Sequence, residues 1–183
     1  MSDRNPQWLR RDFVKLAAAA PLIGASSGLV GPLGQALAKG AAHDPDAAIR
    51  AAFYYGYPLY EFARTEQTLG QALNKPGKIN LLTTRAKLST FQDRVVTAPN
   101  NDTIYSSCFL DLSAGPIEVV SPSMDRYFSI AFMDAFTDNF AYIGTRATGG
   151  KGGRFWVVGP QWRGKAPAGV TLFRSSTNDV WML

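Results

Sequence analysis

Polar side chains that could perform acid–base or binding chemistry gather at two places in the sequence. In APNNDTIYSSCFLDLS, residues 98–113, Asp102 could act as a general base and Tyr105 as a hydrogen-bond donor. In FMDAFTDNFAYIG, residues 132–144, Asp134 could act as a base or bind a cation. The candidate catalytic residues are Asp102, Tyr105 and Asp134, and the candidate ligand-binding residues are Asn101 and Arg146.

The same polar residues also allow a structural interpretation. Residues 99–103, PNNDT, can build a turn in which side-chain oxygens accept backbone N–H groups. Asp134 and Asp138 flank the segment AFT, and neighbouring acids are common in turns. The sequence favours turns at both places and leaves the site hypothesis open.

Other chemistries find less support. One cysteine, Cys108, and one histidine, His43, argue against a Cys/His metal site, so we predict no metal and identify no cofactor. Cys108 alternates with Leu110 and Leu112, which predicts a buried side chain and not a nucleophile. The loop TGGKGG, residues 148–153, lacks the ending of a phosphate-binding loop.

A long helix is expected before these segments. Asp44-Pro45 is a typical helix start, and apolar residues recur at helical spacing from Ile49 to Tyr60. Pro58 should kink this helix or split it in two. Its aromatic residues between Phe53 and Phe62 either pack on a sheet or form the wall of a pocket.

Strand patterns dominate the rest of the chain. Residues 81–97 are ambiguous, with a short helix expected near Leu88–Arg94. We predict an α+β fold, in which the kinked N-terminal helix packs on an antiparallel β-meander or sandwich. The predicted strands are Thr103–Leu112, Ile117–Val120, Tyr127–Asp134, Asn139–Gly144, Arg154–Val158, Val170–Arg174 and Val180–Leu183.

The N-terminus has the pattern of an export signal. Residues 1–38 hold a basic segment, a weakly apolar stretch and a small-x-small cleavage pattern. The basic segment resembles a twin-arginine signal, which predicts a periplasmic or secreted protein that meets the twin-arginine export machinery. Prolines in the apolar stretch argue against a stable membrane anchor. The signal residues are Arg10, Arg11, Phe13 and Lys15, and the cleavage residues are Ala36 and Ala38.

Several motifs of the remaining chain resemble the family called domain of unknown function 1254. They are YYGYPLYEF, the segment from residue 98 to 122, DRYFSIAFMDAFTDNFAYIGTRATGG, FWVVGPQW and TNDVWML. The resemblance implies that residues 39–183 are such a domain, that it is often exported, and that a second, β-rich domain of unknown function 1214 commonly follows. Its motif positions are Tyr57, Pro58, Asn101, Asp102, Thr103, Tyr105, Asp134, Phe140, Gly144, Arg146 and Trp181.

Three hypotheses about function remain. The first is an exported module that binds a small ligand or assists an enzyme. The second is a hydrolase-type enzyme that uses Asp/Tyr acid–base chemistry. The third is a non-functional fragment of a longer two-domain protein, because the chain stops inside a strand pattern at Leu183. The formal net charge is +5, but the basic residues are dispersed, so no nucleic-acid partner is expected.

Overall fold

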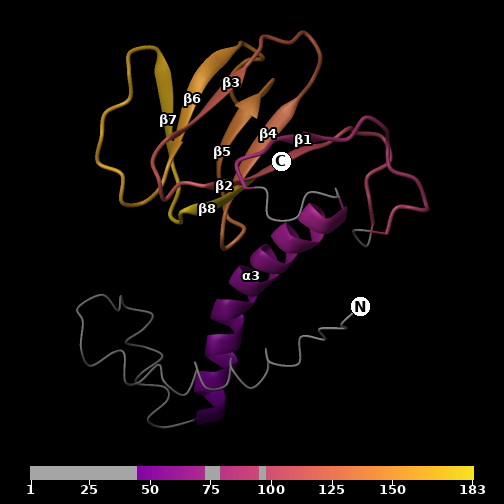
Figure 1. The fold of residues 1–183 in the computed structure, drawn as a ribbon, viewed down its shortest axis with the longest axis vertical. Helices are drawn as coiled ribbons and strands as arrows, with labels where there is room; N and C mark the ends of the chain where they lie inside the picture. The colour runs from indigo at the N-terminus through magenta and orange to yellow at the C-terminus, as the bar shows by residue number, and fades with distance from the viewer. Residues whose placement is uncertain (1–44, 73–78, 95–97) are drawn as a thin grey trace. The chain divides into compact units, whose positions relative to one another are not determined.

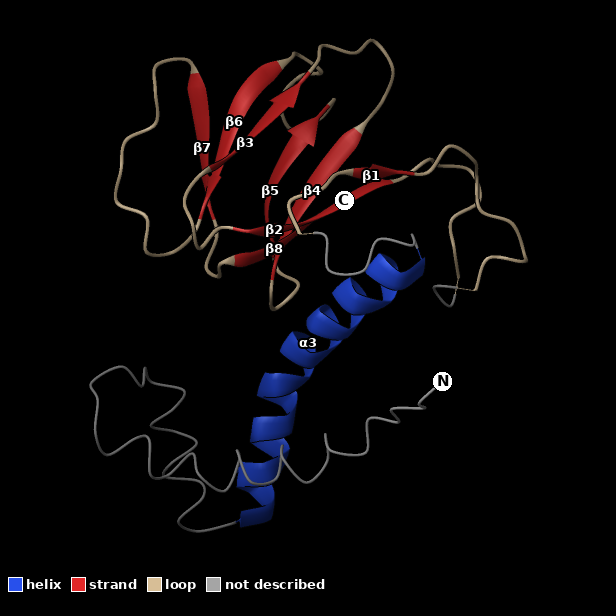
Figure 2. Cartoon of the chain, viewed as in Figure 1, coloured by secondary structure: helices blue, strands red, loops and turns tan. Residues whose placement is uncertain are grey.

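The computed structural model describes residues 45–72, 79–94 and 98–183 (Figure 1). Over these residues the chain forms a long helix followed by strands (Figure 2). The chain divides into two compact units, residues 1–57 and 58–183, and all described strands belong to the second. The prediction of an α+β fold rich in antiparallel strands is confirmed. The predicted export signal lies outside the described residues.

Helix α3, Pro45–Ala72, begins where the sequence predicts. Asp46 in its first turn places a carboxylate at the positive end of the helix dipole. Pro58 lies inside the helix, where it removes one backbone hydrogen bond, yet the helix continues beyond it. The alternative of two separate helices is therefore wrong. Within the described residues, no helix is long and apolar enough to cross a membrane.

The strands agree well with those expected from alternation. Strand β2 begins at Ser106 instead of 103, because the preceding residues form a turn. The short helix expected near Leu88–Arg94 is wrong, since a turn closed by Asp93 occupies that segment. The strands are β1 Thr83–Thr84, β2 Ser106–Asp111, β3 Ile117–Ser121, β4 Ser129–Asp134, β5 Asn139–Gly144, β6 Gly153–Val158, β7 Val170–Arg174 and β8 Asp179–Met182.

The strands form two sheets of different character. The larger has the order β1-β2-β8-β4-β5, and all its pairs are antiparallel. Strand β8 lies between β2 and β4, so the order is not that of a meander. In the smaller sheet, β3-β6-β7, strands β6 and β7 are parallel and are joined by residues 159–169, which contain no helix. Parallel pairs usually need a longer crossover, so the sequence did not indicate this pair.

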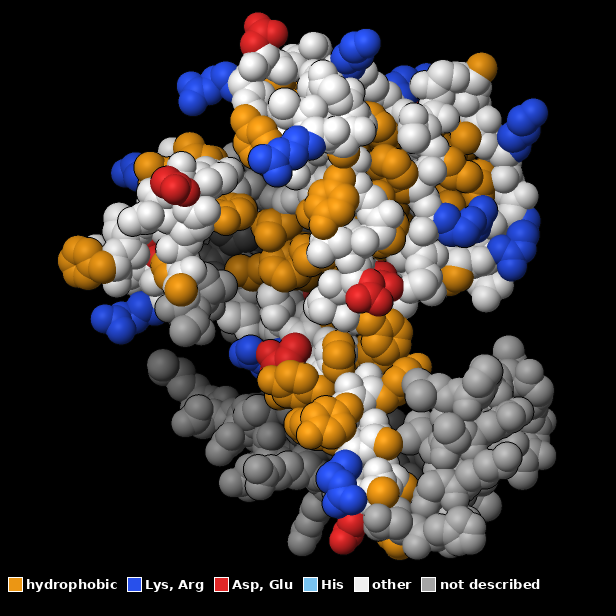
Figure 3. Space-filling model, turned by 180° about the vertical axis from the view of Figure 1, so that it is seen from behind, with side chains coloured by type: hydrophobic (Ala, Val, Ile, Leu, Met, Phe, Trp, Pro, Cys, Tyr) orange, Lys and Arg blue, Asp and Glu red, His pale blue; other side chains and the backbone are white. Residues whose placement is uncertain are grey.

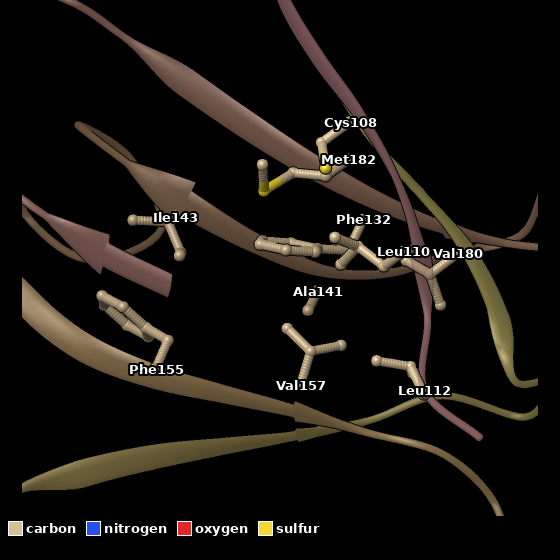
Figure 4. Close-up of a cluster of buried hydrophobic side chains, with 10 residues drawn as sticks. All are labelled: Cys108, Leu110, Leu112, Phe132, Ala141, Ile143, Phe155, Val157, Val180 and Met182. Atoms are coloured by element: carbon tan, nitrogen blue, oxygen red, sulfur yellow. The ribbon is translucent and has the colours of Figure 1, made fainter. Parts of the chain in front are cut away.

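The hydrophobic core lies between the inner faces of the two sheets (Figure 4). Phe132 is fully buried at its centre and lies 5.7 Å, ring centre to ring centre, from Phe173 of β7. Cys108 is buried here as predicted. Because side chains alternate along a strand, the residues between the core positions of β2, β4 and β8 form the opposite, outer face of the larger sheet. The core residues are Cys108, Leu110, Leu112, Phe132, Ala141, Ile143, Phe155, Val157, Val180 and Met182.

Candidate functional site

The first predicted polar segment forms a turn. The Asn100 Oδ1 accepts a hydrogen bond from the backbone N–H of Asp102 at 2.9 Å, which is the expected Asx arrangement. The Thr103 hydroxyl donates to the Asp102 carboxylate at 3.0 Å. Asn101 and Asp102 are exposed at the surface. The turn interpretation is confirmed for this segment.

The second predicted segment is a hairpin organised by Asp134. Its carboxylate is buried and accepts hydrogen bonds from the backbone N–H groups of Phe136 and Asp138, at 2.9 and 3.1 Å. Its other oxygen accepts a hydrogen bond from the Ser176 hydroxyl in the β7–β8 connection. Thr137 has a φ of 68°, a conformation that the hairpin imposes on a non-glycine residue. Both Asp134 oxygens therefore serve the turn and its link to the next loop.

The structure does not bring the predicted site residues together. Asp134 lies at the closed end of the β4–β5 hairpin, whereas Arg146 follows Gly144 at the other end, about 16 Å along the strands. The Arg146 guanidinium lies 5.6 Å from the centre of the Tyr127 ring. Tyr105 precedes β2 at the same sheet end as Arg146, but β8 and β4 lie between the two strands in the sheet order. The individual roles of these residues stay predictions.

A different set of side chains gathers on the outer face of the larger sheet. Phe109 of β2 and Trp181 of β8 are cross-strand partners whose rings stack, with their centres 5.3 Å apart. Met133 of β4 is the partner of Trp181 on its other side, so the three side chains form a row across three strands. We call Phe109, Trp181 and Met133 the outer row. All three are partly exposed, and Figure 3 shows a hollow in the β-rich unit whose floor is hydrophobic.

The outer row has a polar neighbour and a partial cover. The Trp181 indole N–H donates to the Ser107 hydroxyl at 2.7 Å, which fixes the orientation of the indole ring. Phe62 of α3 is buried and meets the Phe109 ring edge to face, with centres 5.6 Å apart. Phe62, one of the aromatic residues in the predicted wall, thus packs against this sheet.

Three carboxylates lie beside the outer row, where β2 ends and β8 begins. Asp111 and Asp179 are direct cross-strand partners, and Glu66 of α3 faces both. Burial raises the pKa of Glu66, and the charges of Asp179 and Asp111 raise it further. By contrast, hydrogen bonds from Ser113 lower the pKa of Asp111. Between Glu66 and Asp111, a proton therefore binds to Glu66 first.

The described residues show neither a group of metal ligands nor a reactive thiol. Within the ranges that the structure describes, no three acidic, histidine or cysteine side chains are grouped so that they could hold a metal ion. Burial raises the pKa of Cys108 to about 11, so its thiol stays protonated near neutral pH. The outer row and its carboxylates are then the best candidate for a functional surface.

Part of this surface could have been found from the sequence. The buried alternation of Cys108 and Leu110 implies that Ser107, Phe109 and Asp111 point to the opposite face. Trp181 already stands out as a motif position. The sequence gives no signal for the neighbours of these residues, because Glu66 and Asp179 approach Asp111 from distant parts of the chain.

The fold and the site define an α+β domain with two facing sheets, and Phe62 from the second half of α3 packs on the aromatic row of one outer face. The chain belongs to the family described as Protein of unknown function (DUF1254), whose model matches residues 79–183. It is also similar to the VPA0106 protein from Vibrio parahaemolyticus, known from a crystal structure. The identity is 28%, the TM-score is 0.55, and the match covers 71% of this chain and 30% of that one. No curated protein matches the chain.

Proposed function

We propose that this protein is an exported module that binds a small ligand or assists an enzyme, and that its ligand lies on the outer row. The observation that carries the proposal is the stacked pair of Phe109 and Trp181, partly exposed on the outer face of the larger sheet. Stacked aromatic rings offer a flat apolar surface, on which another flat apolar group can stack favourably.

The polar groups around the row suit a neutral or cationic ligand with one hydrogen-bonding group. The Ser107 hydroxyl accepts the indole N–H and keeps its own hydrogen, which it can donate to a bound molecule. Glu66, Asp111 and Asp179 disfavour an anion beside the row. Ligand sites typically combine such an apolar surface with a few oriented polar groups.

Titration with neutral bicyclic aromatics, such as indole and 2-naphthol, tests this proposal. Nuclear magnetic resonance of the tryptophan indole N–H groups should show saturable shifts at Trp181. Measured by calorimetry, Trp181→Ala should abolish saturable binding, whereas Trp156→Ala, on the smaller sheet, should leave it unchanged. Equal binding by the wild type and Trp181→Ala would place the ligand elsewhere.

Support for the exported location comes from the arginine pair, Arg10 and Arg11, followed by Phe13, Lys15 and a small-x-small pattern. Replacing both arginines with lysine should leave the protein in the cytoplasm, with the export machinery no longer engaged. Cell fractionation measures this directly, and continued export of the double variant would show that another route carries the protein.

The acid–base alternative gains no geometric support. The Asp134 carboxylate already accepts hydrogen bonds from its own turn and from the Ser176 hydroxyl, and it lies far along the sheet from Tyr105. The chain spans less than a third of the VPA0106 protein. On that ground we propose that a module of this kind works beside further domains in larger relatives.

A further inference from the structure

The second half of α3 is held on the larger sheet by few side chains. Among residues 58–69, whose side chains the structure describes, Phe62 alone is buried. Its ring contacts Phe109 of the outer row. A helix segment with one buried side chain among those described can have a docking equilibrium that a nearby charge shifts.

Glu66 is placed to act on that contact. It follows Phe62 by four residues, so the two side chains lie on the same helix face and point to the same surface. The carboxylates that face it are Asp111 from β2 and Asp179 from β8. These two are themselves directly opposite each other, an arrangement that repels when both are charged.

The neighbouring cation on the helix has a carboxylate partner of its own. Arg64 pairs with Glu61 through its Nη2 at 2.6 Å and its Nε at 2.9 Å. Among the described residues, burial and the charges of Asp179 and Asp111 all favour the protonated carboxyl of Glu66.

We propose that residues 58–69 of α3 form a pH-sensitive latch over the outer row. The latch docks when Glu66 is protonated, and it is pushed from the sheet when Glu66, Asp111 and Asp179 are all charged. Docking covers Phe109, and release exposes it together with Trp181. The latch follows from the geometry of the helix and the sheet, and it does not depend on the proposed ligand.

The direction of the response follows from linkage. Because the pKa of Glu66 is higher in the docked state than its ordinary value of 4.5, docking is strongest below that value and weakens as the pH rises through the raised pKa. Each unit by which the pKa is raised corresponds to about a tenfold change in the docking equilibrium.

Amide hydrogen exchange of the whole chain at pH 4.5 to 8 tests the latch, with rates corrected for their intrinsic pH dependence. Protection of residues 62–69 should fall as the pH rises, while protection of β6 in the core stays constant. In Glu66→Gln the protection should stay high at every pH. Asp179→Asn should reduce the pH dependence without removing it.

Glu61→Gln is the matched control, because it removes a carboxylate of the same helix segment that pairs with Arg64. Its profile should follow the wild type. A wild-type profile without pH dependence would overturn the latch. So would the same pH dependence in Glu66→Gln, or the loss of the dependence in Glu61→Gln.

Discussion

The carboxylate of Asp134 lies in an electrostatic environment opposite to that of a second group in the same domain. This second group consists of Glu66, Asp111 and Asp179. Asp134 is buried among donors, with two backbone N–H groups and one hydroxyl directed at its oxygens. Glu66 faces two further carboxylates, and both raise its pKa. A carboxylate surrounded by hydrogen-bond donors stabilises a turn. A carboxylate that faces like charges instead makes a contribution to stability that changes with pH.

The comparison also changes where function is sought. Asp134 has the sequence context of a catalytic acid, yet its oxygens are used by the hairpin. Glu66 lies in α3 but outside the family motifs, yet its surroundings oppose its charge. For this domain, the partners of a carboxylate are therefore more informative than its position in a motif.

The largest effect is expected for Asp134→Ala. It leaves two backbone N–H groups and the Ser176 hydroxyl without their acceptor, which should lower the free energy of unfolding by about 3 kcal/mol. Urea denaturation at pH 7 measures the change.

Asp134→Asn is the control, since its side-chain oxygen can still accept the two N–H groups, and it should cost about 1 kcal/mol. An Asp134→Ala variant that keeps its stability would contradict the comparison between Asp134, which is held by hydrogen bonds, and Glu66, which faces like charges.

A smaller effect of the opposite sign is expected for Glu66→Gln. The folded pKa of Glu66 is raised, so its contribution to stability is complete below pH 4.5 and is lost as the pH rises through the folded value. Removing the charge should therefore increase the free energy of unfolding at pH 7 by about 0.5 kcal/mol, a modest value because the site is partly solvated. The gain should vanish near pH 4, and a gain that is independent of pH would argue against charge as its cause.

The smallest effect is expected for Asp102→Ala. Its carboxylate is exposed and accepts a hydrogen bond from the neighbouring Thr103 hydroxyl, while Asn100 closes the turn without it. The free energy of unfolding should change by less than about 0.5 kcal/mol. A loss comparable to that of Asp134→Ala would mean that this turn carries more of the fold than its contacts indicate.

Much of the fold is predictable from the sequence because it depends on local patterns. The alternation of Cys108, Leu110 and Leu112 identifies both the strand and its buried face, and most other strands follow in the same way. The helix start at Pro45 follows from capping chemistry. The turn at Asn100–Thr103 follows from the side chains that build it.

The site is less predictable because it depends on pairing between distant segments. The insertion of β8 between β2 and β4 brings Trp181 beside Phe109 and Asp179 beside Asp111. No local pattern specifies this order, since the same alternation would suit a meander. The β4–β5 hairpin separately places Asp134 and Arg146 at opposite ends of its strands, although both belong to one motif-rich region of the sequence.

The most direct test of the account is the pKa of Glu66, measured by nuclear magnetic resonance titration of its side-chain carboxyl carbon. The account predicts a value above the ordinary 4.5, and a fall toward that value in Asp179→Asn. A pKa at or below 4.5 in the wild type, or one that does not respond to Asp179→Asn, would contradict it.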